Sequence, residues 1–186
     1  LCDRRQRQMC IRDRPSTGSL QEAVQKIKEQ GYSHIIGLPI ATGLSSTMNG
    51  MKLACDMLEM PVTLVDTKGT ASNQKYLVEV AAKLAGEGKS PEEIKEILEK
   101  LVEDSATIIM VPNLEHLKKG GRITPAVATL AGLLKIVPIM KLNYDLGGKI
   151  DTFGKVRTAK KANLKIIDHM AVSYTHLRAH ETLMNL

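Results

Sequence analysis

Hydroxyl side chains and a glycine crowd the segment Leu38-Pro39-Ile40-Ala41-Thr42-Gly43-Leu44-Ser45-Ser46-Thr47. The segment follows the carboxyl end of a predicted parallel strand and precedes a predicted helix, which is where open α/β sheets bind ligands. Free N–H groups at a helix start, with hydroxyls beside them, suit a carboxylate or a phosphate. A plain helix N-cap accounts for one of these hydroxyls, but not for four of them around a glycine. The pattern therefore predicts an anion-binding loop.

Titratable residues are few near this loop. Asp66 ends the next predicted strand and Lys68 follows it. The chain could instead be an α/β enzyme that acts on a small phosphorylated or carboxylated substrate through the same loop. Asp66 and Lys68 would then be its candidate acid and base. Gly86-Glu87-Gly88-Lys89-Ser90 lacks the earlier glycine and the preceding strand of a P-loop, so it is interpreted as a turn between helices. No cysteine pair between residues 15 and 171 could bind a metal.

Arg122 and Arg157 are the only arginines between residues 15 and 171, where lysine is otherwise the surface cation. An arginine there indicates a position that needs a planar fork of donors for a carboxylate or a phosphate. A structural ion pair is the competing interpretation.

Alternating helix and strand signals position these residues. Ser19-Leu20-Gln21-Glu22 is a capping-box pattern for a first helix, and Ser90-Pro91-Glu92-Glu93 starts a later one. The predicted strands are 34–38, 62–66 and 107–111, and the helices between them run from the loop to about 60, over 73–85 and from 90 to 103. Short apolar strands that alternate with helices predict an α/β fold, a parallel doubly wound sheet with helices on both faces.

After residue 104 the pattern changes. Short helices at 114–119 and 126–134 precede an antiparallel pair of strands, 137–145 and 149–156, and a lysine-rich helix from 158. The pattern therefore predicts an α/β domain over 15–104 and an incomplete second α+β subdomain over 105–171.

Composition is that of a globular protein, with 186 residues, 43% hydrophobic, 25% charged and a net charge of +6. No apolar stretch approaches the ~20 residues of a membrane-spanning helix, so no integral membrane segment is expected. Residues 1–14 hold five Arg and two Asp, and both ends change composition abruptly. We therefore interpret 1–14 and 172–186 as non-native tails. A basic arm that binds nucleic acid is the alternative for the first tail, and no nucleic acid is otherwise expected. Cys55 alone in the body fits a cytoplasmic protein.

The order and spacing of four motifs resemble those of the DegV family. They are the 31–47 strand and loop, Val65-Asp66-Thr67-Lys68, Leu117-Lys118-Lys119-Gly120-Gly121-Arg122-Ile123 and Lys155-Val156-Arg157-Thr158. The resemblance covers about residues 15–170. It implies a protein that is not itself an enzyme, carries a long-chain fatty acid without a cofactor, and serves as the acyl-binding subunit of bacterial fatty acid kinase.

The resemblance also assigns roles to residues. Thr42 stands where the family has a serine that hydrogen-bonds the fatty acid carboxylate, with the Gly43 amide and Ser45 in the same loop. Arg122 and Arg157 match arginines that engage the kinase catalytic subunit, which supplies ATP and Mg²⁺. The acyl chain is expected in an apolar tunnel between the two subdomains. Because the family's first strand and a carboxylate-side histidine have no counterpart, the chain resembles a central fragment of a family member.

Overall fold

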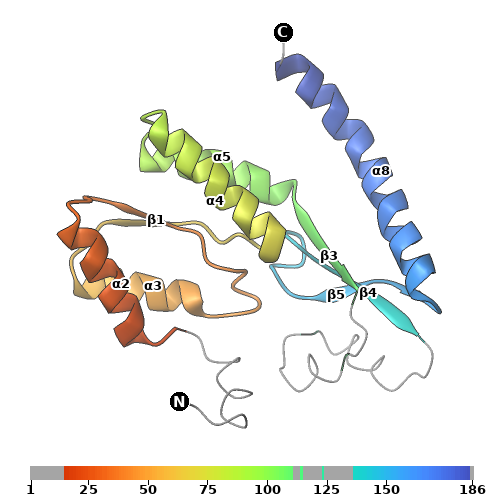
Figure 1. Ribbon diagram of the computed structural model, residues 1–186, viewed down its shortest axis with the longest axis horizontal. Coiled ribbons are helices and arrows are strands. Elements are labelled where there is room, and N and C mark those ends of the chain that lie inside the picture. Colours follow the sequence, from red (N-terminus) through yellow and green to blue (C-terminus); the bar gives the residue numbers. More distant parts are fainter. Residues whose placement is uncertain (1–14, 111–113, 115–122, 124–135, 185–186) are drawn as a thin grey trace. The chain divides into compact units, whose positions relative to one another are not determined.

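The computed structural model describes residues 15–110, Leu114, Ile123 and 136–184, with side chains up to Val172 (Figure 1). The chain divides into two compact units. Unit 1 comprises Leu1–Thr107 and Leu142–Lys149, and unit 2 comprises Ile108–Lys141 and Ile150–Leu186. The chain therefore leaves unit 1 and returns to it for one short segment.

A parallel pair of strands, β1 (Ile35–Gly37) and β2 (Val62–Leu64), forms the centre of unit 1. Helices α2 (Thr17–Glu29) and α3 (Thr47–Met57) cover one face, and α4 (Ala71–Gly86) and α5 (Pro91–Glu103) cover the other (Figure 1). Successive side chains of a strand point to opposite faces. Ile35 accordingly packs into the cluster with α2 and α3, and Ile36 into the cluster with α4 and α5. The α/β fold with helices on both faces of a parallel sheet is confirmed.

Helix caps explain where two of these helices begin. Ser90 caps α5 as predicted, because its side chain accepts from Glu93 N and the Glu93 carboxylate accepts from Ser90 N. The prediction of a start at Ser19 was wrong for α2. Ser16 is the N-cap, and its Oγ accepts from Ser19 N at 3.1 Å. Ser16 has the extended backbone that an N-cap requires, whereas Ser19 is already helical.

Unit 2 contains a second sheet of three strands in the order β3-β4-β5. They are β3 (Ala106–Met110), which begins in unit 1, β4 (Val137–Asn143) and β5 (Asp151–Val156). The predicted antiparallel pairing of the last two is confirmed, with Val137 opposite Val156. The strand predicted at 107–111 lies in this sheet, beside β4, and not beside β1 and β2.

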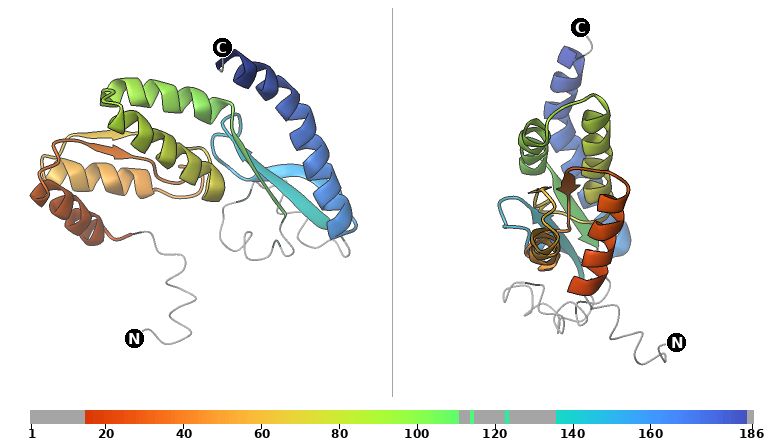
Figure 2. Two further views of the ribbon diagram at one scale, coloured as in Figure 1. Left: turned by 45° about the horizontal axis from the view of Figure 1, so that its top comes forward. Right: turned by 90° about the vertical axis from the view of Figure 1, so that its left-hand side faces the viewer.

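Helix α8 (Ala159–Met184) follows β5 in unit 2 (Figure 2). Ala162 is fully buried, and the His169 ring lies 4.6 Å from the Phe153 ring. Lys165 Nζ lies 5.8 Å from the same ring, close enough for a cation–π contact. The helix continues through residues 172–184, the segment interpreted as a tail. That residues 1–14 and 172–186 are non-native stays a prediction. The subdomain boundary near residue 105 also stays a prediction.

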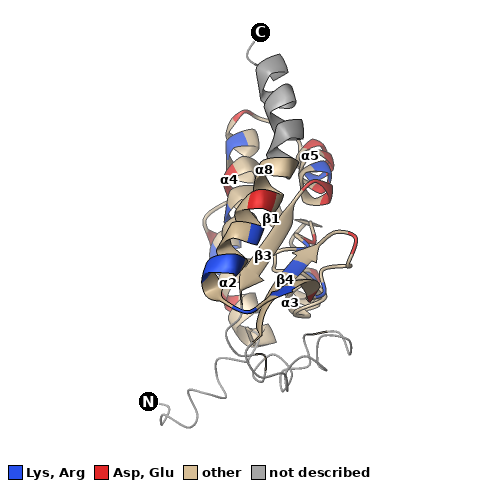
Figure 3. Ribbon diagram, turned by 90° about the vertical axis from the view of Figure 1, so that its right-hand side faces the viewer, with Lys and Arg blue, Asp and Glu red and all other residues tan. Residues whose placement is uncertain are grey.

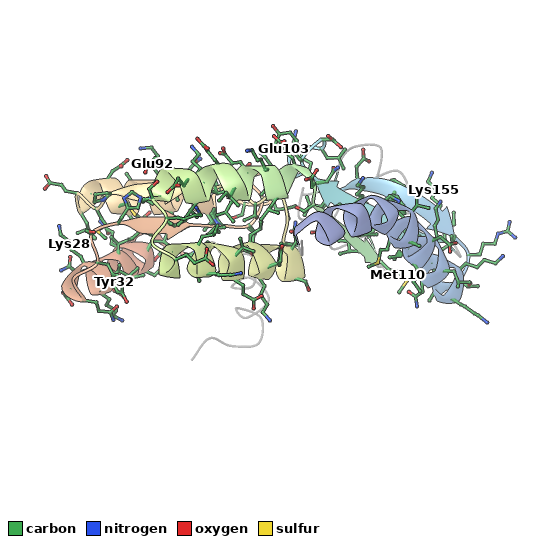
Figure 4. All side chains as sticks on the ribbon, turned by 90° about the horizontal axis from the view of Figure 1, so that it is seen from above. Lys28, Tyr32, Glu92, Glu103, Met110 and Lys155 are labelled. Carbon is green, nitrogen blue, oxygen red and sulfur yellow. The ribbon has the colours of Figure 1, made fainter. Side chains whose placement is uncertain are left out.

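Several charged side chains on α3, α4 and α5 form ion pairs with residues four positions away. Figure 3 shows acidic and basic residues side by side on α5, where Lys95 lies 3.8 Å from Glu99, four residues away. Lys28, labelled in Figure 4, donates to the Leu58 carbonyl at 2.8 Å and so ties α2 to the end of α3. Exposed ion pairs such as Lys95–Glu99 contribute little to stability.

Two searches of the described residues gave negative results. None of their helices is long and apolar enough to cross a membrane. No three His, Cys, Asp or Glu side chains among them could together hold a metal ion. The helices predicted at 114–119 and 126–134 lie outside the described residues, apart from the buried Leu114.

Candidate functional site

The loop after β1 folds into a tight turn before α3. The N–H groups of Leu44 and Ser45 both donate to the Ala41 carbonyl, at 2.9 and 3.1 Å. Ser45 Oγ accepts from Thr47 N at 3.3 Å and lies 2.7 Å from Thr47 Oγ1. The two hydroxyls share one hydrogen bond, so only one of their two protons is used between them. The predicted ligand residues Thr42, Gly43 and Ser45 therefore all lie within this one turn.

Asp66, just after β2, binds both the Thr42 loop and Lys68. Its Oδ1 accepts from Thr42 N and Lys68 N, each at 3.1 Å. Its Oδ2 accepts from the Thr42 hydroxyl and from Lys68 Nζ, the latter at 2.7 Å. The carboxylate thus receives four hydrogen bonds and joins the segments that follow the two parallel strands.

These bonds decide the charge of Asp66. Burial alone would raise the pKa of Asp66, but the hydrogen bonds from Lys68 and Thr42 outweigh it and hold the pKa below its usual value. The alternative enzyme requires titratable groups at the loop, and the structure does bring Asp66 and Lys68 there. They neutralise each other, however, and a carboxylate with a lowered pKa is a weak general base at neutral pH.

Two hydrogen bonds to backbone carbonyls also join these loops. Ala41 N donates to the Gly69 carbonyl at 3.0 Å, and the fully buried Thr67 donates from Oγ1 to the Pro39 carbonyl at 2.8 Å. Lys68 has a φ of 46°, in the left-handed region that non-glycine residues rarely adopt. The surroundings hold this conformation, which lets both Lys68 N and Lys68 Nζ reach Asp66.

A third segment, the turn of residues 143–149, packs on this loop within unit 1. A Cβ built on Gly43 would lie 2.3 Å from the Gly148 carbonyl oxygen. Gly148 has a φ of +71°, and a Cβ there would lie 2.8 Å from the Ala41 Cβ. Sequence reasoning missed this contact, because the turn was assigned only to linking two strands. The pair Gly147-Gly148 was its one visible signal.

The arginines are placed differently. Arg157 is exposed and lies in unit 2, between β5 and α8. Arg122 lies outside the described residues. The structure therefore gathers Thr42, Gly43 and Ser45 with Asp66 and Lys68, and it gives no account of a site that contains the arginines.

A family model described as "Uncharacterised protein, DegV family" matches residues 6–184. The chain belongs to the DegV family. A DegV domain-containing protein of Streptococcus pneumoniae is 34% identical over 155 residues, which are 83% of this chain and 54% of that protein. The chain spans about half the length of the curated relatives it matches.

Solved structures of DegV proteins have the same fold. The chain is similar to a fatty acid binding DegV family protein from Streptococcus agalactiae, with a TM-score of 0.77 and 30% identity, over 87% of this chain and 57% of the other. It is also similar to a DegV protein from Thermus thermophilus whose structure is described by its fatty acid binding, with a TM-score of 0.76 and 30% identity, over 87% and 56%. The resemblance noted in the sequence is confirmed.

Proposed function

We propose that this chain binds a long-chain fatty acid and holds its head group at the loop of residues 41–47. The observation that carries the proposal is the convergence of that turn with the Asp66–Lys68 segment at the carboxyl ends of two parallel strands. The two structural relatives at 30% identity that are described as fatty acid binding support the choice of ligand.

Thr42, Gly43 and Ser45 have separate roles in this proposal. Among the described residues the Gly43 N–H donates to no acceptor, so it can donate to a ligand oxygen. The Ser45 and Thr47 hydroxyls retain one proton for the same purpose. Thr42 is exposed and contributes its Oγ1.

The acyl chain supplies most of the affinity. Removing about sixteen carbons from water contributes on the order of 10 kcal/mol at ~0.8 kcal/mol per CH₂, before the costs of association. Hydrogen bonds at the head group contribute about 1 kcal/mol each. Affinity should therefore follow chain length, while the loop fixes the orientation of the acid.

Lipid extraction from the purified chain tests this function. After denaturation with organic solvent, mass spectrometry should detect fatty acid in the wild-type chain, and Ser45→Ala should bind added fatty acid about fivefold more weakly, as the loss of about 1 kcal/mol implies. Ser72→Ala, an exposed serine on α4, is the matched control and should retain the lipid. A small phosphorylated or carboxylated molecule in place of lipid would favour the alternative enzyme, and an extract without either would contradict the proposal.

We further propose that the chain is a carrier for a kinase subunit in the cytoplasm. The partner would transfer the γ-phosphoryl group of ATP to a carboxyl oxygen of the bound acid, giving acyl phosphate and ADP, and a proton bound to the acid would be released to solvent. Arg157, exposed between β5 and α8, and Arg122 are the proposed contact residues. No ATP-binding motif is needed in this chain, because the partner would supply ATP and Mg²⁺.

Binding to a bacterial fatty acid kinase catalytic subunit tests the second proposal. In biolayer interferometry with the purified subunit, Arg157→Ala should weaken binding. Lys160→Ala, an exposed cation three residues away, should not. Equal binding by both variants would contradict the role of Arg157, and no binding by the wild type would contradict the partnership.

A further inference from the structure

The Thr42 hydroxyl has a fixed hydrogen-bond direction. A threonine hydroxyl has one proton and two lone pairs. Asp66 accepts from Lys68 N, Lys68 Nζ and Thr42 N, so its carboxylate is the acceptor of the fourth bond also, and the Thr42 proton is used in that bond. Thr42 Oγ1 is left with lone pairs only. Toward a ligand it can accept a hydrogen bond but cannot donate one.

The rest of the same turn has the opposite character. The Gly43 N–H, without an acceptor among the described residues, and the spare proton of the Ser45–Thr47 hydroxyl pair are donors. The residues of the turn therefore include both donors and one acceptor. An ionised carboxylate has acceptors only, whereas a protonated carboxylic acid has one carbonyl acceptor and one O–H donor.

We infer that this loop binds the neutral, protonated form of its ligand's head group, with the acid O–H donating to Thr42 Oγ1 and the carbonyl accepting from the Gly43–Thr47 turn. Asp66 is then the positioning residue that fixes the polarity of Thr42. The inference rests on the proposed function and specifies its ligand class as acyl chains whose head group is neutral and carries a proton.

Charges around Thr42 agree with this choice. The charged side chains on the three segments of the site are Asp66, Lys68, Asp145 and Lys149. Asp66 and Lys68 form an ion pair at 2.7 Å, and the Asp145 carboxylate accepts from Asn143 Nδ2 at 2.9 Å. Asp145 and Lys149 are both exposed. The group that directly faces the Thr42 hydroxyl is thus the Asp66 carboxylate, whose charge is offset by Lys68, so this ion pair does not favour an ionised head group over a neutral one.

Carbon-13 NMR of the wild-type chain with carboxyl-labelled dodecanoic acid tests the inference. The chemical shift of the bound carboxyl carbon should remain that of the protonated acid at neutral pH, where the free acid is ionised. In calorimetry, affinity for dodecanoic acid should fall about tenfold per pH unit from about pH 6 to about pH 8, because each unit costs the binding of one proton. Affinity for dodecan-1-ol should stay constant.

Variants separate positioning from structural support. Asp66→Asn can donate to Thr42 and so free the threonine proton, and its affinity for dodecanoic acid should lose the pH slope. Thr42→Val, which lacks the acceptor, should lose the slope without altering the Asp66 carboxylate. Asp56→Asn, an exposed aspartate on α3, should retain it. A bound carboxylate shift at neutral pH would overturn the inference alone, whereas no bound dodecanoic acid at any pH would overturn the proposed function and the inference with it.

Discussion

Gly43 faces the backbone carbonyl of Gly148 so closely that a Cβ on Gly43 would lie 2.3 Å from the carbonyl oxygen and 2.5 Å from the carbonyl carbon. Real Cβ atoms do not approach other atoms so closely, and a backbone group cannot rotate away as a side chain can. The packing of these two segments, which are about one hundred residues apart in sequence, therefore requires glycine at position 43.

Gly43→Ala should destabilise unit 1 by about 1–3 kcal/mol, the usual cost of overpacking. Urea denaturation followed by circular dichroism measures the change. Gly86→Ala is the control, because a Cβ on Gly86, at the end of α4, has no atom within 4 Å. That variant should be neutral or slightly stabilising. Equal midpoints for the two variants would show that the turn of residues 143–149 does not pack on Gly43.

Asp66 predicts a dependence of stability on acid. Its folded pKa lies below the unfolded value of about 4, so its contribution is fully present above that pH and is lost as pH falls through the folded pKa. At about pH 6 Asp66→Asn should be less stable than wild type. The denaturation midpoints of the two proteins should approach each other as pH falls below about 4. A difference that stays constant as pH falls would refute the role of the ionised carboxylate.

Ser90→Ala tests the capping box of α5. Loss of the Oγ acceptor leaves the Glu93 N–H without its partner, and the free energy of unfolding should fall by about 1 kcal/mol. Ser72→Ala, on the exposed surface of α4, should change it by less than about 0.5 kcal/mol. Matching losses in both variants would mean that the effect comes from the hydroxyl deletion in general.

Leu98→Ala tests the cluster between α4, α5 and the parallel strands. Leu98 is fully buried with Leu77 and Ile94, so truncation should cost about 2–5 kcal/mol. Leu53→Ala removes the same atoms from a side chain that is 49% exposed and should cost much less. If thermal denaturation gave similar midpoints for both, Leu98 would not lie in a packed core.

Sequence patterns predicted what is decided locally. The motif Ser90-Pro91-Glu92-Glu93 is sufficient to predict the N-cap of α5, because both hydrogen bonds of the capping box join Ser90 and Glu93. The prediction of Ser19 as the N-cap of α2 was wrong, because Ser16 lies three residues earlier and caps the helix instead. Which serine takes the extended backbone depends on how the helix packs, and the pattern does not contain that information.

The site divides in the same way. Its loop was predicted from neighbouring hydroxyls, and Asp66 and Lys68 were recognised as nearby titratable residues. Their bonds to Thr42 depend on the parallel pairing of β1 with β2, and Gly148 reaches the loop only through tertiary folding. Contacts of this kind join segments that are distant in the sequence, so they produce no regular residue spacing from which they could be predicted.

The return of residues 142–149 to unit 1 affects how the protein is made. A nascent chain that has emerged from the ribosome only as far as Thr107 already contains β1, β2 and the helices that cover them, yet Gly43 still lacks its contact with Gly148. The loop is completed some forty residues of translation later. A proteolytic cut between Thr107 and Leu142 would thus leave the two sides of one site on separate peptides.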